Sequence, residues 1–278
     1  MKRILTIQDI SCVGKCSLTV ALPIISAMGV ETAILPTAVL STHTMFSNFT
    51  YKDLTDQIKP ITAHWKKEGI SFDAIYTGYL GSFEQIALMK ELFQEFKTEK
   101  NLIFVDPAMA DNGKLYSGFN ETFAREMAGL CSQADLIVPN LTEASLMTGT
   151  EYKEIYREEE IKELLKRLSD LGARISILTG VSLSEGMTGV MGYDRETGEY
   201  DFYEHGKHPV SYHGTGDIFS STCVGALTGG RGWKEAIRIA ADYTSECIRL
   251  TCDDEKSRPY GVNFEEALPF LLEKSALS

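Results

Sequence analysis

Short apolar runs alternate with longer amphipathic stretches over most of the chain. The runs at 4–8, 32–36, 74–77 and 102–105 are apolar almost throughout, which is typical of strands buried in a parallel sheet. The segment 16–28 lies between the first two runs and is closed by a glycine, so it predicts a helix. A strand–helix–strand start implies parallel pairing and an α/β fold. Further strands are expected at 136–139 and 175–180, and further helices at 83–96, 141–147, 158–171, 218–228, 233–251 and 264–272.

Three segments depart from this alternation. Two strand-like runs, 188–193 and 200–203, flank a turn and predict an antiparallel hairpin at the edge of the sheet. The segment 41–48 is polar and is followed by poorly periodic residues up to Ile61, which predicts a loop that could serve as a lid. Residues 209–212 are interpreted as the end of a strand. The chain contains no repeat or linker, so a single domain over 1–278 is expected.

Composition narrows the classes of function. The chain has 278 residues, of which 44% are hydrophobic, enough for one large core. A net charge of -12 argues against nucleic acid and against an anionic membrane surface as partners. No apolar run approaches the ~20 residues that a membrane span needs. The first residues run directly into a strand pattern, and the six cysteines are scattered, which together predict a cytoplasmic protein with reduced thiols.

The turn Gly214-Thr215-Gly216-Asp217 opens a helix of small and apolar residues. The first N–H groups of a helix have no partner within the helix, and its dipole is positive there, so this turn predicts an anion site. Asp217 then falls in the first turn, where its carboxylate could take a proton from a hydroxyl group. Donors aimed at a phosphoryl group beside such a base favour phosphoryl transfer. The alternative is a carboxylate that merely hydrogen-bonds the turn.

Polar or aromatic residues also follow the other expected strands. The carboxyl ends of parallel strands form the ligand edge of a doubly wound sheet, so these residues are candidates for one site. Two carboxylates near one loop, Asp106 and Asp111, suggest a metal-assisted reaction. The alternatives are local: Asp9 as a helix cap, Asx turns in the 106–111 loop, and a capping box from Asn140 and Glu143. The candidates are Asp9, Tyr79, Asp106, Asp111, Asn140, Glu143 and Thr179.

The stretch Gly14-Lys15-Cys16-Ser17 superficially resembles a phosphate-binding P-loop. That motif needs a glycine five residues before Gly14, where the chain has Asp9, and a serine or threonine at Cys16. Both requirements fail, so a P-loop ATPase is rejected, and the stretch has no assigned role.

The chain resembles the pyridoxal kinases of the ribokinase-like superfamily. Gly-Thr-Gly-Asp and Asn-x-x-Glu mark the superfamily, and the His-Thr and Thr-Gly-Tyr segments point to the kinases of B6 vitamers. The matching segments are 7–8, 41–44, 78–82, 106–107, 139–143 and 214–217, in family order over almost the whole chain. The resemblance implies a three-layer α-β-α sandwich, a mostly parallel central sheet with antiparallel edge strands, and a homodimer.

The resemblance also implies roles. The activity would be that of an ATP:pyridoxal 5′-phosphotransferase, which phosphorylates pyridoxal, pyridoxamine and pyridoxine to recover pyridoxal 5′-phosphate. Asp217 would be the base, and Gly214, Thr215 and Gly216 the anion hole. Asp9, Thr44 and Tyr79 would contact the vitamer. Asp106, Asn140 and Thr179 would contact ATP, while Asp111 and Glu143 would serve Mg²⁺. A monovalent cation such as K⁺ is a further candidate.

The preferred vitamer and the exact activity are left open by the sequence. Many pyridoxal kinases have Ser-His after Ile-Gln, whereas this chain has Asp9-Ile10. Asp9 could pair with a protonated pyridine nitrogen or accept from the 3-hydroxyl group, which affects the preferred vitamer. A hydroxymethylpyrimidine (phosphate) kinase of thiamine synthesis is the second enzyme hypothesis. A sugar kinase fits less well because the chain lacks a Gly-Gly-rich start, and an inactive vitamer-binding protein would have lost Asp217 or Glu143.

Overall fold

The computed structural model describes residues 1–210 and 212–275. The chain forms two compact units: unit 1 combines residues 1–76 with 208–278, and unit 2 comprises residues 77–207. Each unit contains strands and helices of its own. Within the described ranges, no helix is long and apolar enough to span a membrane.

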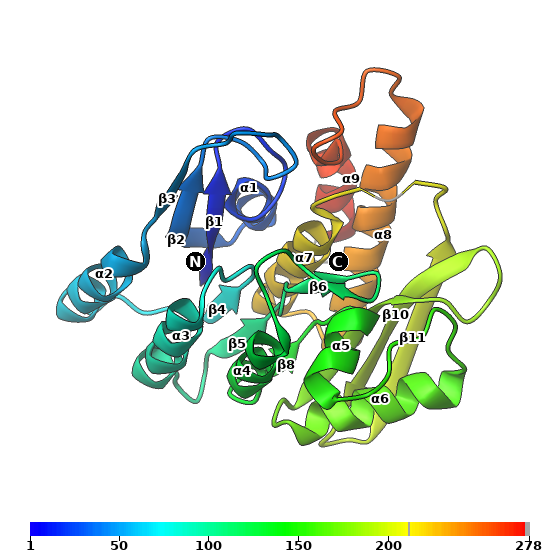
Figure 1. Cartoon of the computed structure of the whole chain (residues 1–278), viewed down its shortest axis with the longest axis horizontal. Coiled ribbons are helices and arrows are strands. Elements are labelled where there is room, and N and C mark those ends of the chain that lie inside the picture. Colours follow the sequence, from blue (N-terminus) through cyan, green and yellow to red (C-terminus); the bar gives the residue numbers. More distant parts are fainter. Residues whose placement is uncertain (211, 276–278) are drawn as a thin grey trace. The chain divides into compact units, whose positions relative to one another are not determined.

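Unit 1 has a sheet in the strand order β4-β1-β2-β3, in which β1 and β2 pair in parallel and β3 is an antiparallel edge strand. In Figure 1, α1, α7, α8 and α9 are gathered on one side of these strands and α2 lies on the other. The strands are β1 (Arg3–Ser11), β2 (Glu31–Leu40), β3 (Tyr51–Asp53) and β4 (Ala74–Thr77), whose last residue begins unit 2. The helices are α1 (Leu18–Ala27), α2 (Thr55–Lys67), α7 (Thr215–Thr228), α8 (Trp233–Asp253) and α9 (Phe264–Ser275).

The low bulk of α7 explains how unit 1 packs. Its residues from Ile218 to Ala226 are all buried, and the helix packs against both α1 and α8. A Cβ atom at Gly225 would lie 2.6 Å from the sulfur of Met28, so a larger residue there would require the Met28 side chain to move. The expectation of a buried helix of small residues is confirmed.

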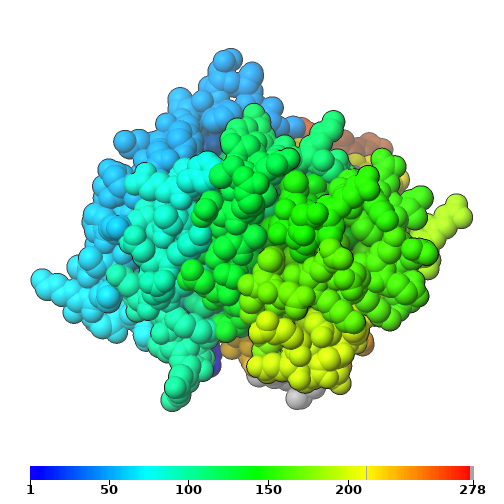
Figure 2. Space-filling view, turned by 60° about the horizontal axis from the view of Figure 1, so that its bottom comes forward, coloured from blue at the N-terminus to red at the C-terminus, as the bar shows by residue number. Residues whose placement is uncertain are grey.

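Unit 2 has a sheet in the order β11-β10-β9-β8-β5. β5, β8 and β9 pair in parallel, and β10 and β11 form the expected antiparallel hairpin. Helices α3 to α6 pack against one another in sequence and form much of the surface in Figure 2, where they run from cyan to yellow-green. The strands are β5 (Leu102–Val105), β6 (Ala110–Asp111), β7 (Lys114–Leu115), β8 (Leu136–Ile137), β9 (Ile175–Val181), β10 (Met187–Asp194) and β11 (Glu199–Gly206). The helices are α3 (Phe83–Phe96), α4 (Glu121–Cys131), α5 (Leu141–Thr148) and α6 (Glu158–Asp170).

The sequence pattern was wrong at several boundaries. Asp9 does not follow the first strand but lies inside β1, at a shift in the pairing with β2 between Gln8 and Ile10. Residues 209, 210 and 212 form no strand, and Ser211 lies outside the described residues. The poorly periodic segment contains β3 and the start of α2, and α4 was not anticipated. Short elements carry too few residues for a clear period, which explains the misses at β3, β6 and β7.

Candidate active site

The Gly-Thr-Gly-Asp turn forms the N-terminus of α7, as expected. Gly214 is the N-cap with a left-handed backbone (φ 81°), the helix begins at Thr215, and Asp217 lies in its first turn. A Cβ atom at Gly214 would lie 2.1 Å from the carbonyl oxygen of Lys15, so the position admits only glycine. At Gly216, in contrast, a Cβ atom would meet nothing within 4 Å. The first N–H groups of a helix have no partner within the helix, so the start of α7 suits a bound anion.

Asp217 is held from the loop between β1 and α1. The Ser17 N–H donates to Asp217 Oδ2 at 3.0 Å, and the Ser17 hydroxyl donates to Asp9 Oδ1 at 2.7 Å. Burial raises the pKa of Asp9, while the bond from Ser17 lowers it. The neighbouring Cys16 thiol has its pKa raised to about 12, first by burial and then by the charges of Asp217 and Asp9. One serine thus joins two carboxylates that the sequence placed more than 200 residues apart.

Ser17 is a site residue that sequence reasoning missed. A helix from Cys16 was expected, which would place Ser17 inside it, but α1 begins at Leu18 and Ser17 has a φ of 51° and a ψ of -132°. The sequence carries no mark of this conformation, because serine is a common residue just before a helix.

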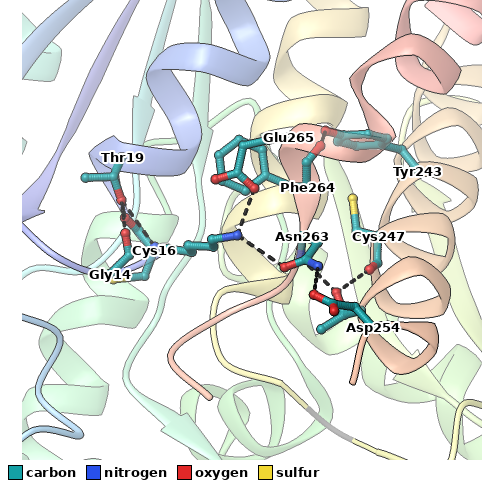
Figure 3. A network of polar contacts seen from close by, with 11 residues as sticks. Gly14, Cys16, Thr19, Tyr243, Cys247, Asp254, Asn263, Phe264 and Glu265 are labelled. Carbon is teal, nitrogen blue, oxygen red and sulfur yellow. Dashed lines mark hydrogen bonds and ion pairs between the residues drawn. The ribbon is translucent and has the colours of Figure 1, made fainter. Parts of the chain in front are cut away.

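The segment Gly14–Ser17, which does not fit the P-loop motif, packs between the Gly214 turn and the segment before α9, and we call it the wedge. The Lys15 carbonyl lies against Gly214, and the Lys15 Cβ lies 2.4 Å from where a Cβ of Gly261 would be. The Lys15 ammonium donates to Glu265 Oε2 at 2.8 Å and to Asn263 Oδ1 at 3.4 Å. Figure 3 shows this network, which continues through Asn263 to Asp254 and toward Cys247. The wedge fixes the Gly214 turn against the segment that precedes α9.

The loop after β2 contacts the loop between β1 and α1. The His43 N–H donates to the Val13 carbonyl at 2.8 Å, and the His43 ring lies 5.1 Å from the ring of His213, next to Gly214. Burial, followed by the proximity of His213, lowers the pKa of His43. Thr44 is exposed in the same loop. The structure thus brings the predicted lid loop to the anion turn, and the role of Thr44 toward a vitamer stays a prediction.

In unit 2, Glu143 and Asn140 form the capping box of α5. Asn140 Oδ1 accepts from the N–H groups of Thr142 and Glu143, and Glu143 Oε2 accepts from the Asn140 N–H at 2.8 Å. Glu143 Oε1 also accepts from the N–H groups of Met109 and Ala110. The capping box expected as the alternative role of Asn140 and Glu143 is therefore present. The Glu143 carboxylate additionally links the 106–111 loop to α5. Burial and the nearby charge of Asp106 raise the pKa of Glu143, against the three N–H bonds.

The donor set around Glu143 suits a hard cation. Asp106 and Glu143 are both buried, and Asp111 directly follows Ala110, whose N–H and carbonyl bond to Glu143 and to the Asn140 amide. Asp111 itself is exposed and accepts from Asn112. Carboxylate oxygens are the ligands that Mg²⁺ prefers, and two buried carboxylates that oppose each other's ionisation are stabilised by a cation. Among the described residues, no group of three or more His, Cys, Asp or Glu side chains is arranged to hold a metal ion by itself. A magnesium ion here would need water or phosphate oxygens to complete its shell.

Thr179 and Tyr79 complete the candidates of unit 2. Thr179 lies inside β9, where its N–H donates to Pro139 and its backbone bridges to Asn140 in parallel. The structure thus brings Thr179 and Asn140 together. Tyr79 follows β4 and is stacked on Phe119 with 5.7 Å between ring centroids. The stacking on Phe119 therefore holds the Tyr79 ring in place.

Three comparisons with known proteins agree with this architecture. The model of the phosphomethylpyrimidine kinase family matches residues 22–259. A pyridoxine kinase from Bacillus subtilis is 32% identical over 186 residues, which span 66% of this chain and 66% of that protein. A protein from Bacteroides thetaiotaomicron, provisionally named a phosphomethylpyrimidine kinase and crystallised with pyridoxal, is 40% identical with a TM-score of 0.92 over 97% of this chain and 95% of its own. A pyridoxal kinase from Lactobacillus plantarum is 29% identical with a TM-score of 0.90 over 98% and 97% of the two chains. The expected ribokinase-like α/β fold is confirmed.

Proposed function

The chain belongs to the phosphomethylpyrimidine kinase family, and from this premise we propose that it phosphorylates the 5′-hydroxyl group of B6 vitamers with ATP. The observation that carries the proposal is the start of α7, where Gly214 to Gly216 present helix N–H groups one residue before the Asp217 carboxylate. The relative that is 40% identical over nearly the whole chain binds pyridoxal, which supports a vitamer as the acceptor. The activity is that of a pyridoxal kinase, exerted by one domain.

We propose the following roles for the residues of each unit. Asp217 takes the proton of the acceptor hydroxyl, and the N–H groups at Gly214, Thr215 and Gly216 stabilise charge on the transferring phosphoryl group. General-base assistance and oriented donors are what phosphoryl transfer chiefly requires from a protein. Asp9, Thr44 and Tyr79 bind the vitamer.

Unit 2 contributes the residues proposed for the nucleotide and the metal. Asp106, Asn140 and Thr179 orient the phosphates of ATP, and Asn140 and Thr179 already adjoin each other. Glu143 and Asp111 hold Mg²⁺ through water or phosphate oxygens. The bound ion neutralises charge on the phosphates. A monovalent cation such as K⁺ is proposed as an additional activator.

Hydroxymethylpyrimidine phosphorylation is the second candidate, because the matching family is named for a phosphomethylpyrimidine kinase. One experiment decides between the two: kcat/KM for pyridoxal, pyridoxamine, pyridoxine and hydroxymethylpyrimidine, measured by ADP release with saturating ATP and Mg²⁺. We expect one of the three vitamers to give the largest value. A larger value for hydroxymethylpyrimidine would overturn the proposal in favour of the second candidate. Repeating the assay in Na⁺ and in K⁺ tests the monovalent cation.

We further propose that the enzyme is a homodimer that acts in the cytoplasm. Sedimentation at several protein concentrations tests the dimer, and a single species of monomer mass would contradict it.

A further inference from the structure

Ser17 occupies an unusual place between two acidic side chains. It is buried, its N–H donates to Asp217 Oδ2 at 3.0 Å, and its hydroxyl donates to Asp9 Oδ1 at 2.7 Å. Both acceptors are carboxylates, and hydrogen bonds to ionised acceptors are stronger than bonds between neutral groups. Ser17 therefore links β1 with the first turn of α7 through its two hydrogen bonds.

The backbone of Ser17 is strained. Its φ of 51° and ψ of -132° lie in a region that glycine adopts readily and serine rarely adopts. The other described non-glycine residues with positive φ are Asn48 and Asn112, and asparagine tolerates that region better than serine does. A residue keeps such a conformation only where its surroundings determine it, and strain of this kind gathers at active sites. The bond from the Ser17 hydroxyl to the buried Asp9 carboxylate is such a determinant.

We propose that Ser17 is a positioning residue for Asp217. Asp9 holds the Ser17 hydroxyl, this tether maintains the left-handed backbone, and the backbone in turn aims the Ser17 N–H at Asp217 Oδ2. The orientation of the base carboxylate therefore depends on Asp9 through Ser17. This inference rests on the proposed function, in which Asp217 takes the proton of the acceptor hydroxyl.

The geometry explains why such a link matters. A catalytic group must be held to within about 0.5 Å of its productive position, and its support comes from neighbours that are themselves fixed. Asp9 is well suited to anchor the link, because it lies in the interior of β1 and is only 7% exposed. The Lys15 carbonyl packs on Gly214 two residues before the Ser17 contact. The loop between β1 and α1 thus fixes both the anion turn and the base that follows it.

Two substitutions at Ser17 test the proposal by a contrast. Ser17→Ala removes the tether and leaves a residue that disfavours positive φ, so kcat should fall about 10- to 100-fold, the range typical when a group that orients a functional residue is lost. The Kd for ADP, measured by calorimetry, should be little changed. Ser17→Gly also removes the hydroxyl but accepts the conformation without a tether, so it should recover most of the kcat. Ser26→Ala, which removes a hydroxyl near the far end of α1, is the matched control and should behave as the wild type.

The outcomes separate the proposal from other roles of the serine. Equal losses of kcat in both variants would mean that the hydroxyl acts directly, which overturns the positioning role. An unchanged kcat in Ser17→Ala with only a lower melting temperature would overturn it as well. If Ser17→Ala does not fold, a double-mutant cycle decides. Asp9→Ala should lower kcat more in the wild type than in the Ser17→Gly background, because glycine needs no tether, whereas equal effects in both backgrounds would overturn the coupling.

The same experiments distinguish this inference from the proposed function. A low kcat in Asp217→Asn together with an unaffected Ser17→Ala variant would overturn the positioning role alone. A wild-type kcat in Asp217→Asn would overturn the assignment of the base, and the inference with it. Any effect of Asp9 on vitamer binding that is independent of residue 17 cancels in the cycle.

Discussion

Asp9 and Asp217 both accept a hydrogen bond from Ser17, but they lie in different types of secondary structure. Asp9 belongs to a strand in the interior of unit 1, whereas Asp217 lies on the first turn of a helix beside Gly216, which borders open space. A helix N-terminus stabilises a negative charge, and a strand interior does not. The position of Asp217 therefore suits a base, and that of Asp9 suits an anchor.

We predict that Asp217→Asn lowers kcat by about 10²- to 10⁴-fold, the usual contribution of general-base assistance. Asparagine keeps the shape and an acceptor oxygen for the Ser17 N–H, so the fold and the Kd for ADP should be little affected. Steady-state kinetics with the preferred vitamer and calorimetry with ADP measure the two quantities. A variant with near-normal kcat would exclude Asp217 as the base.

We predict that Asp9 makes the stability of the fold depend on pH in the unusual direction. Burial raises the folded-state pKa of Asp9 above its ordinary 3.8, so protonation favours the folded state. The contribution of Asp9 to stability is then fully present below pH 3.8 and is lost as the pH rises through the raised pKa. As the pH rises from strongly acidic to neutral, the free energy of unfolding of the wild type should therefore fall relative to that of Asp9→Asn. Urea titrations measure this difference, and Asp56→Asn on the exposed side of α2 is the control. A difference that does not change with pH would contradict the prediction.

At the scale of the element, the start of α5 combines a cap with a proposed metal role. We predict that Glu143→Gln costs only about 1 kcal/mol of stability, as a lost cap does, but greatly reduces activity and raises the Mg²⁺ concentration needed for it. Glu160→Gln is a matched control, because Glu160 Oε2 accepts from the Arg157 N–H at the start of α6 in the same way. The control should lose similar stability and keep its Mg²⁺ dependence. A Glu143→Gln variant that melts early yet works at unchanged Mg²⁺ would leave Glu143 as a cap alone.

The start of α7 depends on the wedge of Lys15. We predict that Gly214→Ala lowers the melting temperature by several degrees, because its Cβ would meet the Lys15 carbonyl and its φ is positive. Strain of this type costs on the order of 1–3 kcal/mol, and about 2–4 °C of melting temperature correspond to each kcal/mol in a chain of this general size. Gly216→Ala, whose Cβ meets nothing, should melt like the wild type even if activity falls. Equal melting temperatures for the two variants would contradict this account.

At the scale of the whole molecule, the expectation of a single domain can be tested with the two tryptophans. Trp65 in α2 and Trp233 in α8 both belong to unit 1, so tryptophan fluorescence reports on that unit, whereas far-ultraviolet circular dichroism reports on both. We predict coincident unfolding transitions in urea by the two probes, as a single cooperative domain requires. Separate midpoints would show that the two units unfold independently.

The sequence alone determined the fold class and most of the elements. Long amphipathic helices carry enough residues to show their period, and a turn between two strand-like runs marks a hairpin, so α3, α6 and α8 and the hairpin of β10 and β11 were predicted closely. The Gly-Thr-Gly-Asp turn was also recognisable, because two glycines before a helix of small residues leave few other interpretations.

Only the tertiary structure decided what the loop between β1 and α1 does. The Gly14-Lys15-Cys16-Ser17 stretch showed only that it was not a P-loop, because its purpose depends on Gly214, Asp217 and Gly261, which are about 200 residues or more away in the chain. The strained backbone of Ser17 left no trace in the residue type, and Asp9 was placed in a loop although it lies in β1. A local pattern records the conformation that neighbours in sequence prefer, whereas contacts between distant segments can impose another conformation when their hydrogen bonds outweigh the local preference.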